Sequence, residues 1–261
     1  MGKLIFSNSY TVATDDQITM RTNNAAYPKL NVMDLWHPAR NARAGDVTDN
    51  DWLMKFDFGA ATTISAIVLN DVNFDNVTIQ GHASDAWGAP TFTSSTAVTQ
   101  DVIVSRYKLF LPLTAFSYRW LRIFIPTGAV EVGTSISEWS IGSIMLITEH
   151  TELTRNMAYG YKLTSERAYE DIRFGHGGTE RANLGDRLKA LITIVFKIRS
   201  SDDEGELWTF NAVDSNKPMS IYENNGITSR VYVSLRDRGY ESKLVQHNQV
   251  LGNTIKFEEL V

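Results

Sequence analysis

The chain has 261 residues, of which 43% are hydrophobic and 21% charged, with no cysteine and a formal net charge of −5. This composition excludes wholesale disorder, and the missing cysteines exclude disulfides, thiolate metal sites and cysteine nucleophiles. The weak net charge disfavours nucleic acid as a partner, and no apolar run approaches the about 20 residues of a membrane span. The first ten residues, MGKLIFSNSY, lack a signal-peptide pattern, so we expect synthesis and assembly in a cytosol without a membrane partner.

Apolar residues recur with a period of two in the first part of the chain. In 52–59, Met54, Phe56 and Phe58 alternate with Lys55 and Asp57, as in a half-buried strand. Further strands are predicted at 64–72, 77–83, 101–111, 118–126 and 139–147. Turn-rich segments separate them, and only one short helix, at 30–36, is expected. This spacing predicts an antiparallel β-sandwich rather than alternating strands and helices.

The composition changes near residue 150, and five of the six tryptophans precede that point. The polar segment 149–156 is predicted to cross between two units. Strands are then predicted at 190–200, 206–213, 229–237 and 253–260, with Val231, Val233 and Leu235 on one face and Tyr232 on the other. The glycine-rich and charged segment 172–187 has no apolar period and is predicted to be a long loop. The chain is therefore expected to be all-β, with one domain over 1–150 and a β-barrel or sandwich over 151–261.

Three separated segments of the first half carry a family resemblance. They are WLMKFDFGAATTISAIVLNDVNF (52–74), YRWLRIFIP (118–126) and ISEWSIGSIMLI (136–147). In order and spacing they resemble the discoidin (coagulation factor 5/8 type C-like, galactose-binding-like) domain over roughly residues 20–150. The resemblance implies a jelly-roll sandwich for residues 1–150.

The chain lacks the terminal cysteine pair of the animal members of that family, which argues against their membrane-lipid binding. A cysteine-free version followed by about a hundred residues of further β structure is similar to structural proteins of tailed-bacteriophage virions. The segment 151–261 resembles in style the ring-forming β-barrel of distal-tail proteins. The resemblance implies a non-enzymatic virion protein that forms a homo-oligomeric ring at the distal tail or baseplate and contacts neighbouring tail proteins. The alternative is a carbohydrate-binding module that contacts host surface glycans through the jelly roll.

Sugar binding requires exposed aromatic rings together with planar hydrogen-bonding groups. Trp87 lies in the turn-rich segment HASDAWGAPTF, with Asp85 and His82 nearby, and Trp36 beside His37 is a second candidate. Tryptophans in small sandwiches also fill the core, so packing remains the alternative for each. Three tryptophans in or beside strand patterns are assigned to packing: Trp52, Trp120 and Trp139.

Acidic residues crowd the segment AGDVTDNDW, where Asp46, Asp49 and Asp51 offer the oxygen ligands that calcium prefers. An EF-hand loop is excluded because Asp51 occupies the position that requires glycine. Discoidin-like domains can hold a structural calcium near this end of the fold. The resemblance therefore implies that these three aspartates are candidate calcium ligands. Solvated loop carboxylates are the alternative, and no other cofactor is expected.

Catalytic motifs are absent from the sequence: it has no G-x-S-x-G elbow, H-E-x-x-H pair or Walker loop. Glu131 and Glu138 could pair for glycoside hydrolysis, although a β-sandwich with 30 acidic residues offers many such pairs. We therefore expect no enzyme, and an activity on glycans remains a third hypothesis without a motif.

Mixed charges in 172–187 suggest an arm that becomes ordered against a neighbouring subunit. The candidate assembly residues are Arg173, Arg181 and Arg187, together with Glu180. Glycines in the segment permit reshaping, and the cost of ordering would be met on assembly. An ordinary exposed loop is the alternative.

Overall fold

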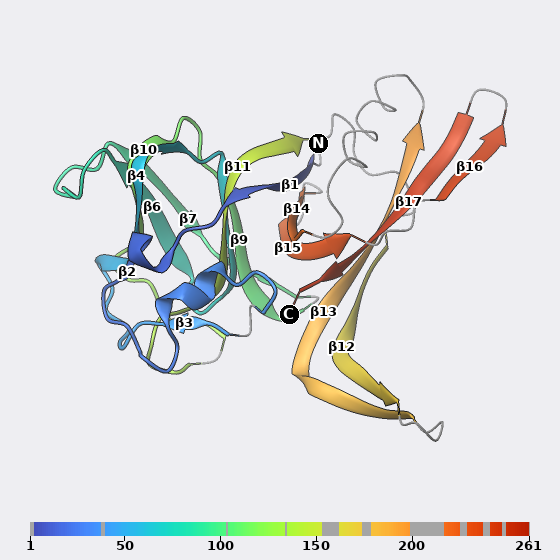
Figure 1. The fold of residues 1–261 in the computed structure, drawn as a ribbon, viewed down its shortest axis with the longest axis horizontal. Coiled ribbons are helices and arrows are strands. Elements are labelled where there is room, and N and C mark those ends of the chain that lie inside the picture. Colours follow the sequence, from blue (N-terminus) through green and yellow to red (C-terminus); the bar gives the residue numbers. More distant parts are fainter. Residues whose placement is uncertain are drawn as a thin grey trace.

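The protein is built from antiparallel β-strands in two sheets (Figure 1). The computed structural model describes residues 3–37, 40–102, 104–133, 135–152, 162–173, 179–198, 217–224, 229–236, 241–246 and 249–260. Within this part of the chain the helices are two short 3₁₀ helices, η1 (Asp15–Gln17) and η2 (Lys29–Met33). The all-β prediction is confirmed. The helix predicted at 30–36 is one turn of η2, which ends before the polar side chain of Asp34.

The smaller sheet has five strands. Their order is β2 (Ile18–Met20), β4 (Asp51–Thr63), β10 (Ser117–Ile125), β6 (Asn76–His82) and β7 (Phe92–Ala97). The inner face of this sheet packs on the larger sheet, and together they enclose one apolar core. On β10, the side chains of Leu121 and Ile123 are buried in this core. Phe124, which follows Ile123 and points to the opposite side of the strand, is partly exposed. The alternation follows from the pleat of a strand and leaves the other face of the sheet outward.

The larger sheet has twelve strands. Its main path is β12 (Lys162–Arg173), β13 (Thr179–Ile198), β17 (Gln249–Glu259), β15 (Ser229–Arg236), β14 (Met219–Asn224), β1 (Lys3–Thr11), β11 (Ser140–Glu152), β5 (Ala66–Val72), β9 (Arg106–Pro112) and β8 (Thr99–Asp101). Off this path, β16 (Glu241–Gln246) pairs with β17 and β3 (Ala42–Arg43) pairs with β11.

Strand β1 joins the two halves of the larger sheet. One of its edges pairs with β11 of the sandwich, and the other pairs with β14 from the second half of the chain. The strands after residue 150 therefore extend a sheet that begins in the sandwich (Figure 1). The division of the chain into domains at residue 150 stays a prediction.

Strands predicted from alternation are confirmed at 52–59, 64–72, 77–83, 118–126, 139–147 and 253–260, and the one predicted at 229–237 is confirmed through Arg236. The segment predicted at 101–111 begins later, at Arg106, after a turn in which Ser105 has a positive φ of 54°. The segment 190–200 is confirmed through Ile198, as the end of β13. Residues 206–213 lie outside the described residues, as do 153–156 of the predicted crossing, and β11 continues through Glu152.

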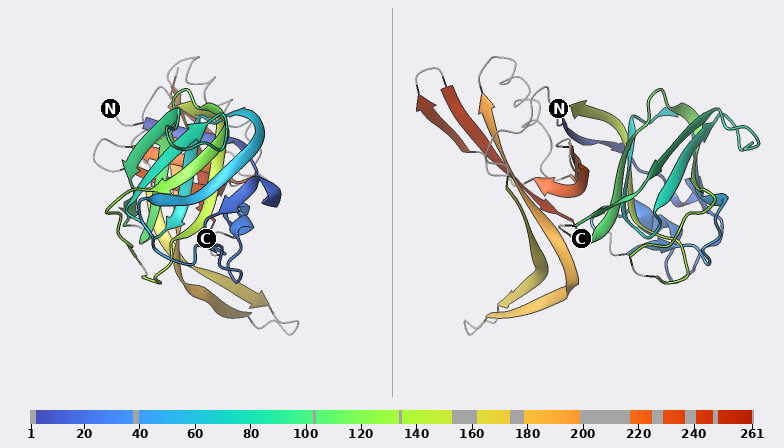
Figure 2. Two further views of the ribbon diagram at one scale, coloured as in Figure 1. Left: turned by 90° about the vertical axis from the view of Figure 1, so that its left-hand side faces the viewer. Right: turned by 180° about the vertical axis from the view of Figure 1, so that it is seen from behind.

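The loop predicted over 172–187 is wrong for the residues that the structure describes. β12 and β13 pair as a long antiparallel ribbon, with Arg173 opposite Thr179 and Asp171 opposite Arg181. Two views show the tip of this ribbon reaching away from the sandwich (Figure 2). Residues 172–187 carry glycines and charges without apolar alternation, whereas half-buried strands are predicted from that alternation. For this reason the pattern did not predict it.

The faces predicted for the strand at 229–237 are confirmed for Val231, Val233 and Tyr232, whereas the side chain of Leu235 lies outside the described part. Val231 and Val233 are buried on one side of β15, but Tyr232 is also buried, in a separate apolar cluster on the other side. The strand lies inside the larger sheet and is covered on both faces.

Candidate functional site

A group of aromatic and charged side chains lies on the outer face of the five-stranded sheet. Lys55 and Trp52 come from β4, Arg122 from β10, and the connection between β6 and β7 adds Asp85 and Trp87. This connection, drawn in teal, reaches beyond the end of the sandwich in Figure 1. We call these five residues the outer-face cluster.

Asp85 links the loop to the sheet. Its carboxylate accepts a hydrogen bond from the indole of Trp87 and a charged one, of 2.9 Å, from Lys55 Nζ. The bond from Lys55 lowers the pKa of Asp85; partial burial opposes this shift, and the bond from Trp87 adds to it. Asp85 is therefore ionised at neutral pH and holds the Trp87 ring by its edge.

Arg122 lies beneath the ring of Trp87. Its Cζ atom is 4.4 Å from the centroid of Trp87 and 5.1 Å from that of Phe124, distances at which a guanidinium is attracted to an aromatic face. Its Nε donates to Gln80 Oε1 at 2.6 Å. The side chain is largely buried, and this burial lowers the pKa of Arg122. Three contacts thus fix the plane of the guanidinium.

Trp52 and Trp120 extend the aromatic surface along the same face. The Nζ atom of Lys55 lies 4.4 Å from the centroid of Trp52, and both tryptophans are partly exposed. Neither of them is among the buried core residues, whereas Trp139 is buried as predicted. For Trp52 the cause is a β-bulge. Phe124 pairs with Trp52 and Ile123 with Met54, so Leu53 is an extra residue that reverses the alternation.

The structure brings together three of the four residues predicted to bind sugar. Trp87 and Asp85 are in contact, and the ring of His82 lies 6.2 Å from that of Trp87. His82 itself is engaged with Ser84 through Nδ1. Trp36 is 45% exposed but follows η2, and none of the contacts among the described residues joins it to the outer-face cluster.

The sequence analysis missed Lys55, Trp52 and Arg122. Lys55 and Arg122 had a signal in the sequence, because each lies between apolar residues of a segment that was predicted to be a strand. The pairing of β4 with β10, which makes them neighbours, follows only from the fold, with Lys55 opposite Arg122.

The three aspartates predicted as calcium ligands are held mainly by nitrogen donors. Asp46 pairs with Arg21, and Asp51 lies 3.6 Å from Arg21 Nε. Asp49 accepts a 2.7 Å hydrogen bond from the backbone of Gly128. Burial opposes ionisation of Asp46, but the Thr48 amide and Arg21 outweigh it and lower its pKa. In the described part of the chain no three His, Asp or Glu side chains gather as they would around a metal ion.

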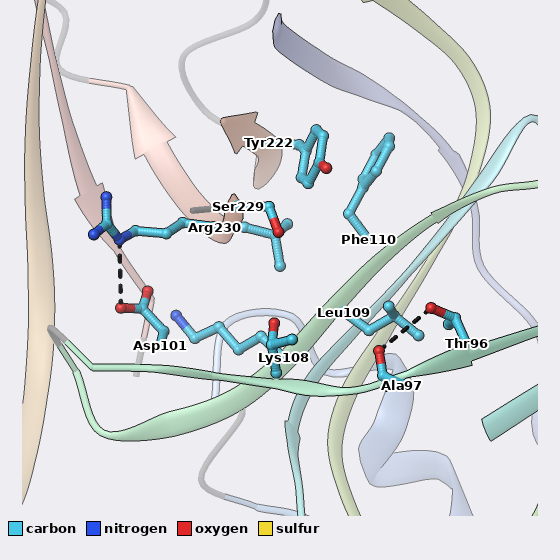
Figure 3. A pocket seen from close by; sticks show the side chains of 11 residues that line it. Thr96, Ala97, Asp101, Lys108, Leu109, Phe110, Tyr222, Ser229 and Arg230 are labelled. Atoms are coloured by element: carbon cyan, nitrogen blue, oxygen red, sulfur yellow. Dashed lines mark hydrogen bonds and ion pairs between the residues drawn. The ribbon is translucent and has the colours of Figure 1, made fainter. Parts of the chain in front are cut away.

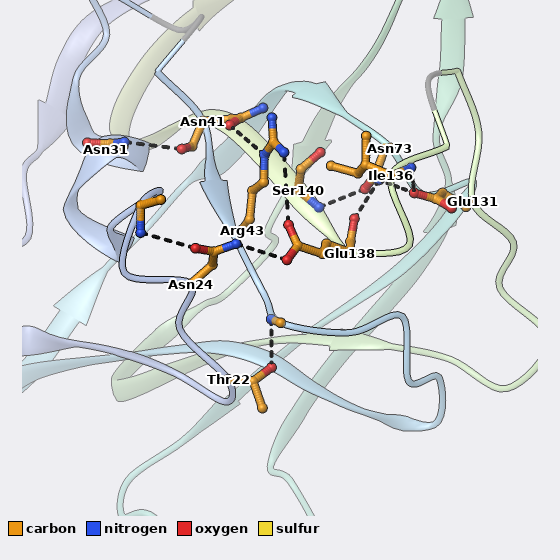
Figure 4. A network of polar contacts seen from close by, with 12 residues as sticks. Thr22, Asn24, Asn31, Asn41, Arg43, Asn73, Glu131, Ile136, Glu138 and Ser140 are labelled. Carbon is orange, nitrogen blue, oxygen red and sulfur yellow. Dashed lines mark hydrogen bonds and ion pairs between the residues drawn. The ribbon is translucent and has the colours of Figure 1, made fainter.

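A polar network closes one end of the sandwich (Figure 4). Asn73 Nδ2 donates to Glu131 Oε1 at 2.9 Å and to the backbone oxygen of Glu138 at 2.7 Å. Glu131 also accepts from Ser135 and the Ile136 amide, and these bonds outweigh its partial burial and lower its pKa. A cavity of about 280 Å³ adjoins Asn73.

Glu138, the second carboxylate of that pair, is also occupied. It accepts a 2.9 Å bond from Asn24 Nδ2 and lies 3.9 Å from Arg43 Nη1. Asn73 thus links the segments that carry the two glutamates, and both side chains accept hydrogen bonds that hold loops in place.

A second cavity, of about 340 Å³, lies where β8 and β9 meet β14 and β15 (Figure 3). On one side, Phe110 stacks on Tyr222 with ring centroids 4.5 Å apart. On the other side, Asp101 lies 4.0 Å from Arg230 Nε, close to Lys108.

Behind this cavity a buried ion cluster joins β9 to β17. Glu259 is fully buried and pairs with Lys108 and with Arg106 Nη2, the latter at 2.9 Å. The backbone amide of Ala190 also donates to Glu259, at 2.8 Å. Burial lowers the pKa of Lys108, and Glu259 opposes that shift. We call Glu259, Lys108 and Arg106 the junction cluster.

The predicted assembly residues all fall on β12 and β13. Arg173 ends β12, Glu180 pairs with Ile172 and Arg181 with Asp171, while Arg187 lies within β13. Their backbone register places them along one ribbon.

Comparisons with known proteins give only distant likenesses. No protein-family profile matches the chain, and no curated protein matches it. The chain is similar to chitosan-binding module 1 from a chitosanase/glucanase of Paenibacillus sp. IK-5, with 16% identity, a TM-score of 0.37, and coverage of 52% of this chain and 97% of the module. A selenomethionine-labelled mutant of that module gives 17% identity and a TM-score of 0.36 over the same shares of the two chains.

None of the described helices has the length and apolar character needed to cross a membrane. The β-sandwich itself is established by the strand pairing of this chain.

Proposed function

We propose that this protein is a non-catalytic carbohydrate-binding protein whose ligand lies on the outer-face cluster. The observation that carries the proposal is the arrangement of Trp87, held at its edge by Asp85 and supported by Arg122, beside the partly exposed Trp52. A sugar ring presents an apolar face and a rim of hydroxyls. The cluster offers aromatic rings for the first and charged groups for the second.

The rigidity of the cluster favours binding. Trp87 sits in a surface connection, where a free side chain would lose rotamer freedom when a ligand arrives. Its contacts with Asp85 and Arg122 hold the ring before binding. Asp85 is held in turn by Lys55, which is anchored on a strand.

The test is a glycan array followed by isothermal titration calorimetry with wild type and Trp87→Ala. We expect glycan binding by wild type and a loss of at least about tenfold in affinity for Trp87→Ala. Trp36→Ala is the matched control, because it removes an exposed tryptophan outside the cluster and should bind like wild type. The proposal fails if wild type binds no glycan or if Trp87→Ala binds equally well.

The absence of turnover is part of the proposal. Glu131 and Glu138, the pair considered for hydrolysis, accept hydrogen bonds from Asn73, Asn24 and neighbouring groups. Such carboxylates serve as acceptors that fix loops. Incubation with any glycan that binds should therefore release no reducing ends.

A second function is supported by a different region. We infer that the chain is also a subunit of a larger assembly, a ring at the distal tail or baseplate of a tailed-bacteriophage virion, where it would contact neighbouring tail proteins. Among the described strands β12 is the last of the larger sheet, and its outer edge runs for 12 residues along a projecting ribbon (Figure 2). Long open edges favour pairing with another chain. Light scattering and negative-stain images should show closed oligomers, and a strictly monomeric protein would contradict this inference.

A further inference from the structure

We propose that the glycan bound by the outer-face cluster carries a carboxylate, as uronate sugars do, and that Arg122 is the group that recognises it. This inference rests on the proposed function, because it concerns the ligand of the same site. It follows from how the cations on this face are paired.

Three cations lie on the outer face, and two of them have a carboxylate partner. Lys55 pairs with Asp85 at 2.9 Å. Arg119 pairs with Asp57 through two hydrogen bonds, of 2.6 and 2.7 Å. Among the described residues none forms an ion pair with Arg122, although Asp51 and Asp85 attract it from further away. Arg122 is thus the cation of this face whose charge is not matched by direct contact.

The hydrogen-bonding edge of Arg122 is also open. Nε is used by Gln80, but the two terminal nitrogens have no hydrogen-bond partner in the described part of the chain. Solvent still reaches these nitrogens, although the side chain as a whole is only 9% exposed. A guanidinium carries five N–H donors in a fixed plane, and a carboxylate is the anion whose two oxygens match such an edge.

The surroundings of Arg122 strengthen this match. Trp87 and Phe124 lie near its Cζ atom, and these rings restrict its plane without using its donors. Because the group is already oriented and largely buried, little order is lost when an anion binds its open edge. A sugar that stacks on the aromatic surface would place a ring substituent within reach of this edge, and a carboxylate there would complete an ion pair.

The experiment compares two probes of the same chain length and different charge, trigalacturonate and its methyl ester, by isothermal titration calorimetry. We expect wild type to bind the acid at least about tenfold more tightly than the ester. Arg122→Gln should abolish this preference. Arg122→Lys, which keeps the charge but loses the planar fork, should retain only part of it.

Arg119→Gln is the matched control. It removes a guanidinium three residues away on the same strand, but one whose donors already serve Asp57, so the preference for the acid should persist. Thermal unfolding of each variant monitors folding, and the wild-type comparison of acid with ester needs no variant.

Four results would contradict one or the other of the two proposals. Equal binding of acid and ester by wild type, or an acid preference that survives in folded Arg122→Gln, overturns the carboxylate inference. Binding of neutral glycans without binding of trigalacturonate also overturns it but leaves the proposed function intact. Failure to bind any glycan, charged or neutral, overturns the proposed function itself.

Discussion

The outer-face cluster and the junction cluster use similar chemistry for different ends. In each, a cation lies against an aromatic ring: Arg122 beneath Trp87 on the outer face, and Lys108 4.6 Å from the centroid of Tyr232 at the junction. At the junction the cations share the buried carboxylate of Glu259, which also accepts from a backbone amide. On the outer face Arg122 keeps an open edge that solvent reaches.

The difference shows how to separate a structural cation from a binding one. Burial of a charge is tolerated when a carboxylate pairs with it, so a matched cation offers nothing to a ligand, and removal of its partner destabilises the native state. A cation that is held in place but not matched is available to a ligand. Accordingly, changes at the junction should reduce stability, and changes on the outer face should reduce binding.

The largest effect is expected for Glu259→Ala. Removal of this carboxylate leaves Lys108 and Arg106 buried without their partner, which costs about 3–5 kcal/mol in the free energy of unfolding. Urea denaturation followed by circular dichroism measures the change. Glu258→Ala is the control next in sequence, since its side chain is 60% exposed and, among the described residues, forms an ion pair with Lys189 alone, so it should cost less than about 1 kcal/mol. Equal losses for both variants would refute the role of the junction cluster.

Gly81→Ala should have the next largest effect, although Gly81 lies between two residues of the outer face. A methyl group there would stand 2.6 Å from Phe116 Cε2 and 2.8 Å from Tyr118 Cδ2, so these rings would have to move. Overpacking of this kind costs about 1–3 kcal/mol. Thermal unfolding checks the loss, and an unchanged midpoint would show that the rings of Phe116 and Tyr118 have room to shift.

Trp87→Ala tests the outer-face cluster, for which we expect a small loss of stability and a large loss of binding. The variant loses the contact with Arg122 and the bond to Asp85, which together should lower stability by only about 0.5–1 kcal/mol. Its glycan affinity should nevertheless fall as described above. A destabilisation as large as that of Glu259→Ala would place Trp87 with the structural groups instead.

The smallest effect is expected on the way the thermal unfolding midpoint changes at acidic pH. The hydrogen bond from Arg119 lowers the pKa of Asp57, so the native state favours the ionised carboxylate. The resulting stability is present above the ordinary aspartate pKa of about 4 and is lost as the pH falls through the lower native value. In Asp57→Asn the unfolding midpoint should therefore fall by about one or two degrees less between pH 7 and pH 3 than in wild type. An identical fall in both proteins would contradict the pairing with Arg119.

Much of the sandwich could be predicted from the sequence, because its strands bury one face and alternate accordingly. Met54 and Phe56 on β4 are examples. The prediction failed where that link between burial and alternation breaks. The bulge at Leu53 turned Trp52 outward, and residues 179–187 of β13 pair as a strand although their sequence shows no apolar alternation.

The candidate site was predictable only in part. Asp85 and Trp87 are neighbours in sequence and were found together. Arg122 and Lys55 join them through strand pairing, with Lys55 lying 30 residues before Asp85 in the chain. Local patterns carry no information about such pairing. Whether a carboxylate pairs with Arg122 depends only on which residues the fold places beside it.

The position of β1 between β11 and β14 has a consequence for biosynthesis. A ribosome releases Lys3–Thr11 long before Ser140–Glu152 and Met219–Asn224, which supply its two neighbours. Until then both edges of β1 lack the strands that pair with them in the native sheet, and exposed edges invite pairing with other chains. Native folding of the larger sheet is therefore completed only after translation has passed β14, and a pause before that point should favour misassembly.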